Sequence, residues 1–126
     1  MLMTSGQGVV VNALLALGFE CIHDDFDLCC MRHVEAPYLL EVQVTFQLVH
    51  DPRVKAPEAR PPVGLTPGLA WLSHKLSLVG CHFDADAFMR DSNEAVFARQ
   101  DTFKFPRTGK DMTARVIVRA RSSRAA

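Results

Sequence analysis

Side chains of the kinds that bind zinc or iron gather in one stretch near the start of the chain and recur once in its second half. They are Cys21, His23, Asp24, Asp25, Asp27, His33, Cys81 and His82. Thiol and imidazole groups are common ligands of these metals. However, residues two apart on a strand, as Cys21 and His23 would be, lie about 7 Å apart, which is too long for one tetrahedral site. A buried Cys21 followed by a turn at Asp24 and Asp25 accounts for the pattern better, so we assign no metal ligand and no cofactor.

A second candidate is an acid–base set, because His82, Asp84 and Asp86 alternate along a predicted strand and would share one face. Imidazole and carboxylate groups exchange protons in general acid–base catalysis. A solvated strand face accounts for these residues just as well. The chain contains no glycine-rich phosphate loop, no serine elbow and no HExxH motif. We therefore assign no catalytic residue, and the sequence leans against an enzyme.

The last predicted strand carries the most informative charges. Arg115, Arg119 and Arg121 fall on one of its faces and flank Ile117. The planar guanidinium group pairs with carboxylate or phosphate and is favoured at interfaces, so we predict that these four residues bind a partner. The alternative is that they are solvated or pair with the acidic residues of 24–27. No aromatic residue lies between the arginines, which argues against binding of single-stranded nucleic acid.

The strongest structural signal is a strict alternation of apolar and polar residues. Leu40, Val42, Val44, Phe46 and Leu48 alternate with Glu41, Gln43, Thr45 and Gln47. A period of two in a segment rich in Val, Phe and Thr predicts a half-buried strand with one face in solvent. Shorter alternations predict further strands over 19–23, 27–34, 81–89, 95–105 and 113–121. Helical periodicity predicts helices from about Gln7 to Leu17 and from Pro67 to Val79, each ended by a glycine, Gly18 or Gly80.

These elements give one helix and three strands twice, separated by the proline-rich residues 51–65. We predict an α+β fold in one domain, residues 1–126. Its pseudo-repeat halves, 7–50 and 66–121, would form a largely antiparallel sheet or a partial barrel with the helices packed on one side. The first helix is apolar almost all round, so we expect it to be covered on more than one side.

The total charge is zero but it is unevenly spread. Residues 1–63 carry four basic and eight acidic side chains, whereas residues 64–126 carry ten and six. From Lys104 onward seven basic residues are opposed by Asp111 alone, a balance that attracts an acidic protein or nucleic acid. The four cysteines form no CxxC motif, which is typical of reduced, mostly buried thiols in an intracellular protein. The apolar run at 9–18 follows no Lys or Arg and is short, so we expect neither a signal peptide nor a membrane span.

The run LLALGFECIHDDFDLCCMRH, followed by LLEVQ, resembles one module of the vicinal-oxygen-chelate family, in which a helix ending in LGF leads into a strand and hairpin. The same run is similar to the LGF helix-to-hairpin segment of the Mediator head-module subunit eighteen. Each resemblance covers about a third of the chain. The chelate family has a strand before each helix, and this sequence departs from that order. Its metal ligands are strand His and Glu residues; Glu41 is the only candidate here, and no metal site is carried over.

The functional prediction is a non-enzymatic protein-interaction or complex-assembly protein. It would bind another protein with an acidic surface through an exposed sheet face and the basic C-terminal strand. A chelate-like, small-molecule-binding or metal-dependent enzyme is the first alternative. A nucleic-acid-associated or transcription-complex subunit is the second, and a homodimer is compatible with all three.

Overall fold

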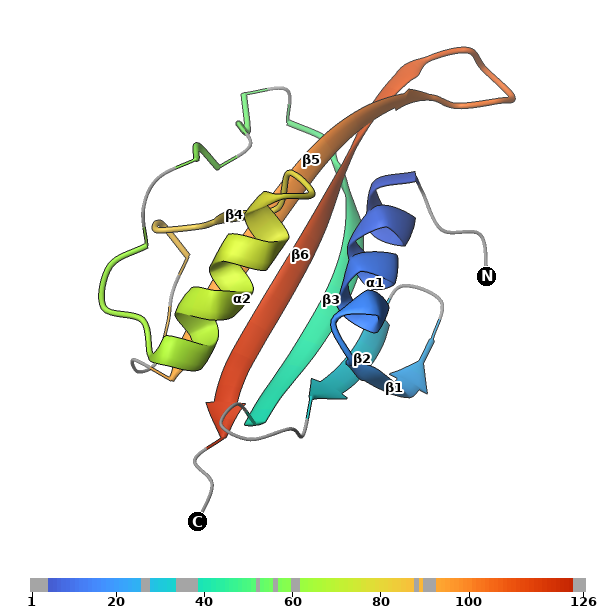
Figure 1. Cartoon of the computed structure of the whole chain (residues 1–126). Helices are drawn as coiled ribbons and strands as arrows, with labels where there is room; N and C mark the ends of the chain where they lie inside the picture. The colour runs from blue at the N-terminus through green and yellow to red at the C-terminus, as the bar shows by residue number, and fades with distance from the viewer. Residues whose placement is uncertain are drawn as a thin grey trace.

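The computed structural model describes residues 5–25, 28–33, 39–51, 53–55, 57–59, 62–87, 89 and 93–123. The elements follow the order α1 (Ser5–Ala16), β1 (Glu20–Asp24), β2 (Leu28–His33), β3 (Leu39–Val49), α2 (Pro67–Ser77), β4 (His82–Phe83), β5 (Glu94–Lys104) and β6 (Asp111–Ser123). The six strands form one antiparallel open sheet in the order β1-β2-β3-β6-β5-β4. Both helices lie on the same face of that sheet (Figure 1). The predicted α+β class and antiparallel sheet are therefore confirmed, and the sheet stays open instead of curling into a partial barrel.

Both helices end in the same way, as the two glycines predict. Gly18 and Gly80 have φ angles of 98° and 75°, in the left-handed region where a side chain is costly. After α1, Phe19 N–H donates to Leu14 O at 3.0 Å; after α2, Cys81 N–H donates to Leu76 O at the same distance. These bonds span five residues and satisfy carbonyls that the helix leaves unpaired. Each helix is thus turned directly into the strand that follows it.

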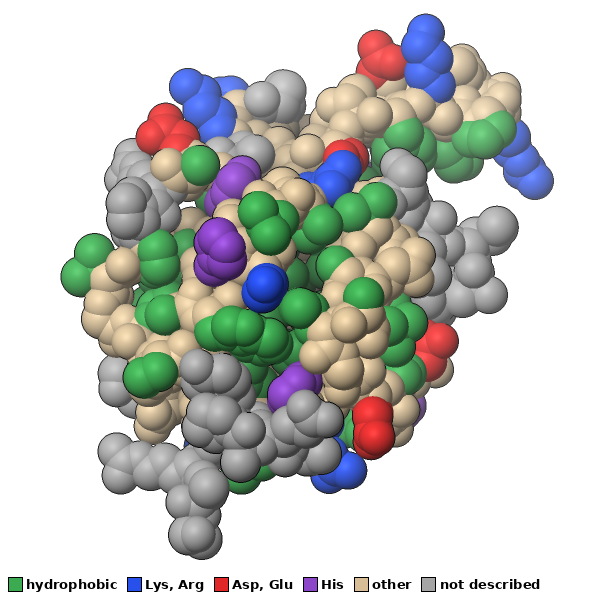
Figure 2. All heavy atoms as spheres, viewed as in Figure 1, with side chains coloured by type: hydrophobic (Ala, Val, Ile, Leu, Met, Phe, Trp, Pro, Cys, Tyr) green, Lys and Arg blue, Asp and Glu red, His purple; other side chains and the backbone are tan. Residues whose placement is uncertain are grey.

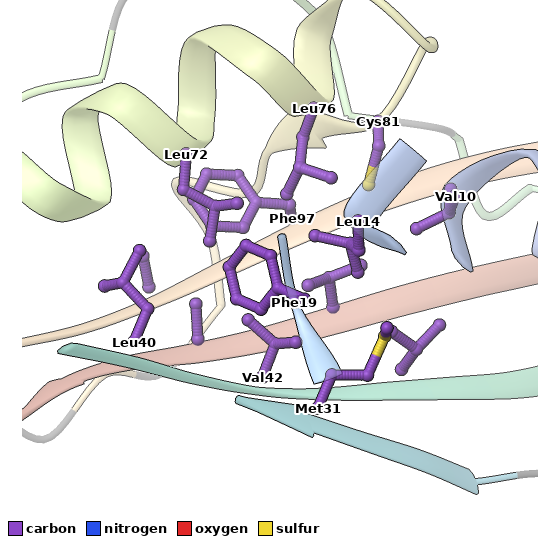
Figure 3. Close-up of a cluster of buried hydrophobic side chains, with 14 of the residues drawn as sticks. Val10, Leu14, Phe19, Met31, Leu40, Val42, Leu72, Leu76, Cys81 and Phe97 are labelled. Atoms are coloured by element: carbon purple, nitrogen blue, oxygen red, sulfur yellow. The ribbon is translucent and has the colours of Figure 1, made fainter. Parts of the chain in front are cut away.

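The core lies between the two helices and the inner face of the sheet (Figure 3). Leu14 of α1 and Leu76 of α2 are both fully buried, as is Phe97 of β5. The inner residues of the central strands complete the cluster: Leu40, Val42, Val44, Val116, Val118 and Ala120. The predicted alternation is confirmed over 40–44 of β3 and 114–120 of β6, where the residues between these positions are exposed or half-buried. It is not met toward the end of β3, because Phe46 is half-buried and Leu48 is 38% exposed.

One expectation about α1 is wrong. Val10, Val11 and Leu14 are buried, but Val9 and Leu15 are 39% and 47% exposed. The helix therefore packs through one side only. The apolar composition of its other side is not matched by a second layer among the described residues, because both helices share one layer on the sheet.

The centre of the sheet is the β3–β6 pair, in which every residue from Leu39 to Val49 has a partner on β6. Strands β5 and β6 continue as a hairpin that projects beyond the helices (Figure 1). The hairpin end, residues 104–111, is exposed throughout. Figure 2 shows Lys and Arg side chains together with acidic side chains along the rim of this projection, and hydrophobic side chains beneath it. None of the helices in the described part of the chain is long and apolar enough to cross a membrane.

Candidate functional site

The outer face of the sheet, opposite the helices, is where the predicted partner-binding row lies. The cross-strand register sets its neighbours. Arg121 of β6 is opposite Glu41 of β3 and Glu94 of β5, and Arg119 is opposite Gln43 and Val96. Ile117 is opposite Thr45 and Ala98, and Arg115 is opposite Gln47 and Gln100. The four predicted residues are therefore adjacent on one face, as the period of two requires.

Arg115 is used inside the molecule. Its Nη2 donates to Asp84 Oδ2 at 3.0 Å, and the two side chains are only 13% and 16% exposed. Its Nη1 also donates to the carbonyl of Lys55 at 3.5 Å. Val54, within the 51–65 connection, also lies on the outer face here, since Gln100 Nε2 donates to its carbonyl at 2.9 Å. The arginine is therefore a structural link between β6, the turn after β4 and this connection.

Arg119 and Arg121 have a different environment, further along β6. Both are exposed, and within the described ranges neither side chain makes a hydrogen bond or ion pair. Ile117 is half-buried, and its carbonyl accepts a hydrogen bond from Thr45 Oγ1 at 3.4 Å. The predicted row is thus divided into one arginine held within the fold and two that face solvent.

A shallow hollow of about 270 Å³ adjoins the two exposed arginines. It is lined by Glu41, Gln43, Met89, Glu94, Ala95, Val96, Arg119, Ala120 and Arg121, and Met89 also packs against the core. No functional role was predicted for Gln43, Met89, Glu94 or Val96. The outward parity of β3 and β5 could have indicated three of them, but Met89 belongs to the 81–89 alternation, and β4 ends at Phe83.

The predicted acid–base set is not assembled. Strand β4 contains only His82 and Phe83, and the chain then turns: Asp86 N–H donates to Asp84 Oδ1 at 3.1 Å. The prediction of a strand from 81 to 89 is wrong because Asp84 accepts hydrogen bonds locally, a common way for Asp to end a strand. Its carboxylate also holds Arg115, so it is committed to structure.

The Cys and His residues of β1 are rearranged by a β-bulge, and Asp27 of the same candidate set lies outside the described residues. Cys21 is opposite Met31 and His23 is opposite Cys30, so Ile22 is an extra residue in β1. An extra residue changes the face to which the following side chain points, so Cys21 and His23 do not share a face as predicted. Cys21 is exposed, not in the core as expected, whereas Cys81 is fully buried beneath α2. In the part of the chain with described positions, no three His, Cys, Asp or Glu side chains are grouped to hold a metal ion.

Two thiols lie close together beside this bulge. Cys21 Sγ lies 3.7 Å from Cys29 Sγ and also donates to His23 O at 3.6 Å. Cys29 is 3% exposed, and burial, reinforced by the neighbouring Cys21, raises its pKa to about 12. Cys30, next along β2, is half-buried and is opposite Gln43 of β3, on the outer face. The exposed thiol of Cys21 and the buried thiol of Cys29 therefore meet on the opposite face of these strands, the inner face.

Comparison of the chain with protein-family models, with curated proteins and with solved structures finds no match.

Proposed function

We propose that the protein is a non-enzymatic interaction or assembly protein that binds an acidic segment of a partner protein across the outer face of its sheet. The observation that supports this most directly is Arg119, an exposed arginine beside the hollow with no hydrogen-bond or ion-pair partner among the described side chains. A guanidinium group can take a carboxylate through two parallel hydrogen bonds. A carboxylate of the partner would accept these two hydrogen bonds from Arg119.

The register distinguishes the two exposed arginines. Arg121 stands between Glu41 and Glu94, so nearby carboxylates already offset its charge. Arg119 stands between Gln43 and Val96, which are uncharged. The positive potential available to an incoming carboxylate is therefore greater at Arg119. We expect this residue to contribute most to binding, with Arg121 setting the orientation of the partner.

The hollow supplies the apolar part of the proposed contact. Val96 is 6% exposed at its floor, and Met89 is half-buried at its side. Methionine adapts its shape to different apolar groups. A volume of about 270 Å³ accommodates one large side chain of the partner. The proposed ligand is thus an acidic residue followed or preceded by an apolar one.

The test is a capture experiment with three versions of the purified chain: wild type, Arg119→Glu, and Arg107→Glu as a matched charge reversal on the exposed hairpin end. The proteins of interest are those that wild type and Arg107→Glu retain and Arg119→Glu loses. They are then purified and titrated directly against all three versions of the chain. We expect at least tenfold weaker binding for Arg119→Glu, because one charged hydrogen-bonded contact is replaced by repulsion. Equal binding by wild type and Arg119→Glu, with unchanged melting curves, would remove the outer face from consideration.

Nucleic acid is the second candidate partner, and the hairpin end is the feature that favours it. Lys104, Arg107 and Lys110 are exposed there beside Phe105, which is 42% exposed. Basic side chains neutralise phosphates, and each one that does so adds to the salt dependence of binding. If nucleic acid binds this projection, Arg107→Glu weakens the complex and lowers its salt slope, whereas Arg119→Glu leaves both unchanged. The same two variants therefore separate the two partners.

We also propose that the two halves, 7–50 and 66–121, are an αβββ pseudo-repeat within one domain, joined by 51–65. The sheet order, which runs β1-β2-β3 and then β6-β5-β4, and the matching helix ends at Gly18 and Gly80 support this. The strands of the two halves differ in length, since β1 has five residues and β4 has two. In this proposal the arginine row of β6 lies where the two halves meet, at the β3–β6 pair.

A further inference from the structure

We propose that Cys21 and Cys29 are an oxidisable thiol pair that a peroxide converts to a disulfide between β1 and β2. The pair is independent of the arginines on the outer face, because Cys29, like its buried neighbour Met31, lies on the inner face of β2. Its basis is the distance of 3.7 Å between the two sulfur atoms, together with the contrast between an exposed Cys21 and a buried Cys29.

The strand arrangement explains why the two thiols meet. Asp24 is opposite Cys29 and Cys21 is opposite Met31, so the cysteines are diagonal neighbours across the antiparallel pair. Diagonal side chains are ordinarily further apart than directly opposed ones. The extra residue, Ile22, bends and twists β1 locally and so brings the Cys21 thiol toward Cys29. The bulge is therefore the feature that makes the pair.

The movement needed to close the bond is small. A disulfide has a sulfur–sulfur distance of about 2.05 Å, so the atoms must approach by about 1.7 Å from their separation of 3.7 Å. β1 is the edge strand of the sheet, and all five of its residues are exposed. Rotation of the Cys21 side chain and a slight shift of this strand can supply the movement without disturbing the core.

The reaction is a two-electron oxidation. The Cys21 sulfur, which solvent reaches, attacks the oxygen–oxygen bond of hydrogen peroxide, forms a sulfenic acid and releases hydroxide, which is protonated to water. The Cys29 sulfur then attacks the Cys21 sulfur, gives up its proton, and displaces a second water. In total, two thiols and one peroxide become one disulfide and two waters, and two electrons pass from sulfur to oxygen. Since burial raises the pKa of Cys29 to about 12, the second step should accelerate as the pH rises.

The test treats the full chain with hydrogen peroxide, blocks the remaining thiols by alkylation, and digests with a protease that cuts between the two cysteines. We expect a linked peptide pair containing Cys21 and Cys29, lighter than the reduced pair by about 2 Da for the two hydrogens lost. Cys30→Ser is the matched control: it should lose two free thiols on oxidation, as wild type does. Cys21→Ser should lose none to an intrachain bond.

Two results would overturn the proposal. One is a linked peptide that joins Cys21 to Cys30, which the Cys30→Ser variant would abolish. The other is accumulation of oxidised Cys21 with no linked peptide in wild type, even at raised pH. Because Cys21 is exposed, its serine variant is expected to fold, and the wild-type peptide analysis does not depend on any variant. Hydrogen exchange on oxidised wild type should also slow at β1 amides, a change that Cys21→Ser should not show.

Discussion

Replacement of Arg99 by methionine should be among the most destabilising changes at a residue that is not fully buried. Arg99 Nε lies 3.1 Å and 3.0 Å from the two carboxylate oxygens of Asp101, and Nη2 donates to Oδ1 at 3.1 Å. Its Nη1 donates to Val79 O at 2.6 Å, just after α2. On the other side, Gly6 of α1 packs so closely on Asp101 that an added Cβ would overlap its carboxylate. One ion pair therefore joins both helices to β5.

The magnitude follows from this geometry. Removing one partner of a buried, hydrogen-bonded ion pair costs about 3–5 kcal/mol. The two side chains here are 25% and 24% exposed, so water partly solvates the carboxylate that remains. We therefore expect Arg99→Met to lower the free energy of unfolding by about 2–3 kcal/mol. For a chain of this length that corresponds to a fall in Tm of roughly 6–15 °C.

Urea unfolding at neutral pH measures the effect, with Asp101→Asn and the double variant completing a mutant cycle. Arg53→Met is the matched control, since Arg53 binds Asp51 with similar distances but the two side chains are 89% and 44% exposed. Exposed pairs contribute little, so this variant should unfold like wild type. If Arg99→Met and Arg53→Met have equal stability, or if the cycle gives no coupling between Arg99 and Asp101, the inference that exposure decides between these two pairs is refuted.

Four other substitutions test the packing, the charges and a buried thiol. Gly6→Ala should destabilise the protein by about 1–3 kcal/mol because the added Cβ overlaps Asp101. Gly8→Ala should stabilise it by up to about 1 kcal/mol, because a Cβ there meets nothing within 4 Å. Thermal melts compare the two variants. Arg115→Met should cost about 1–2 kcal/mol in urea unfolding, because it leaves a largely buried carboxylate unpaired. Burial raises the pKa of Cys81 to about 12 from an ordinary 9.0, so the folded protein keeps this proton while the unfolded chain releases it. Stability from this thiol is complete below pH 9 and is lost between pH 9 and 12, and Cys81→Ala should unfold with a shallower alkaline decline in urea midpoint.

The strands whose pattern is set by burial could be predicted from the sequence. β3 and β6 lie at the centre of the sheet, so the alternation that begins at Leu40 identified β3, although burial follows it only as far as Val44. The two glycines after the helices were equally informative about where each helix ends. A residue with positive φ is needed there to turn the helix into the next strand. The parity of β6 also placed Arg115, Arg119 and Arg121 on one face correctly.

The predictions that failed depended on contacts between distant residues, which the local sequence pattern does not contain. The bulge at Ile22 and the early turn at Asp84 each interrupt an alternation that reads as continuous in the sequence. The division of the arginine row was equally hidden, since Arg115 is bound by Asp84 from a turn 31 residues away. The apolar composition of α1 on all sides likewise did not indicate that Val9 and Leu15 would be left in solvent.

The position of the β3–β6 pair has a consequence for how the chain assembles. Thr45 and Ile117, bonded across this pair, are 72 residues apart in the sequence, so the middle of the sheet closes only after most of the chain is available. Until then β3 is an unpaired edge bearing alternating apolar residues, a template that another copy of the same strand could join. We expect sheet closure to limit the folding rate, since distant pairings form slowly. During synthesis, the first three strands would carry this open edge until β6 leaves the ribosome, which makes nascent chains the form most prone to aggregate.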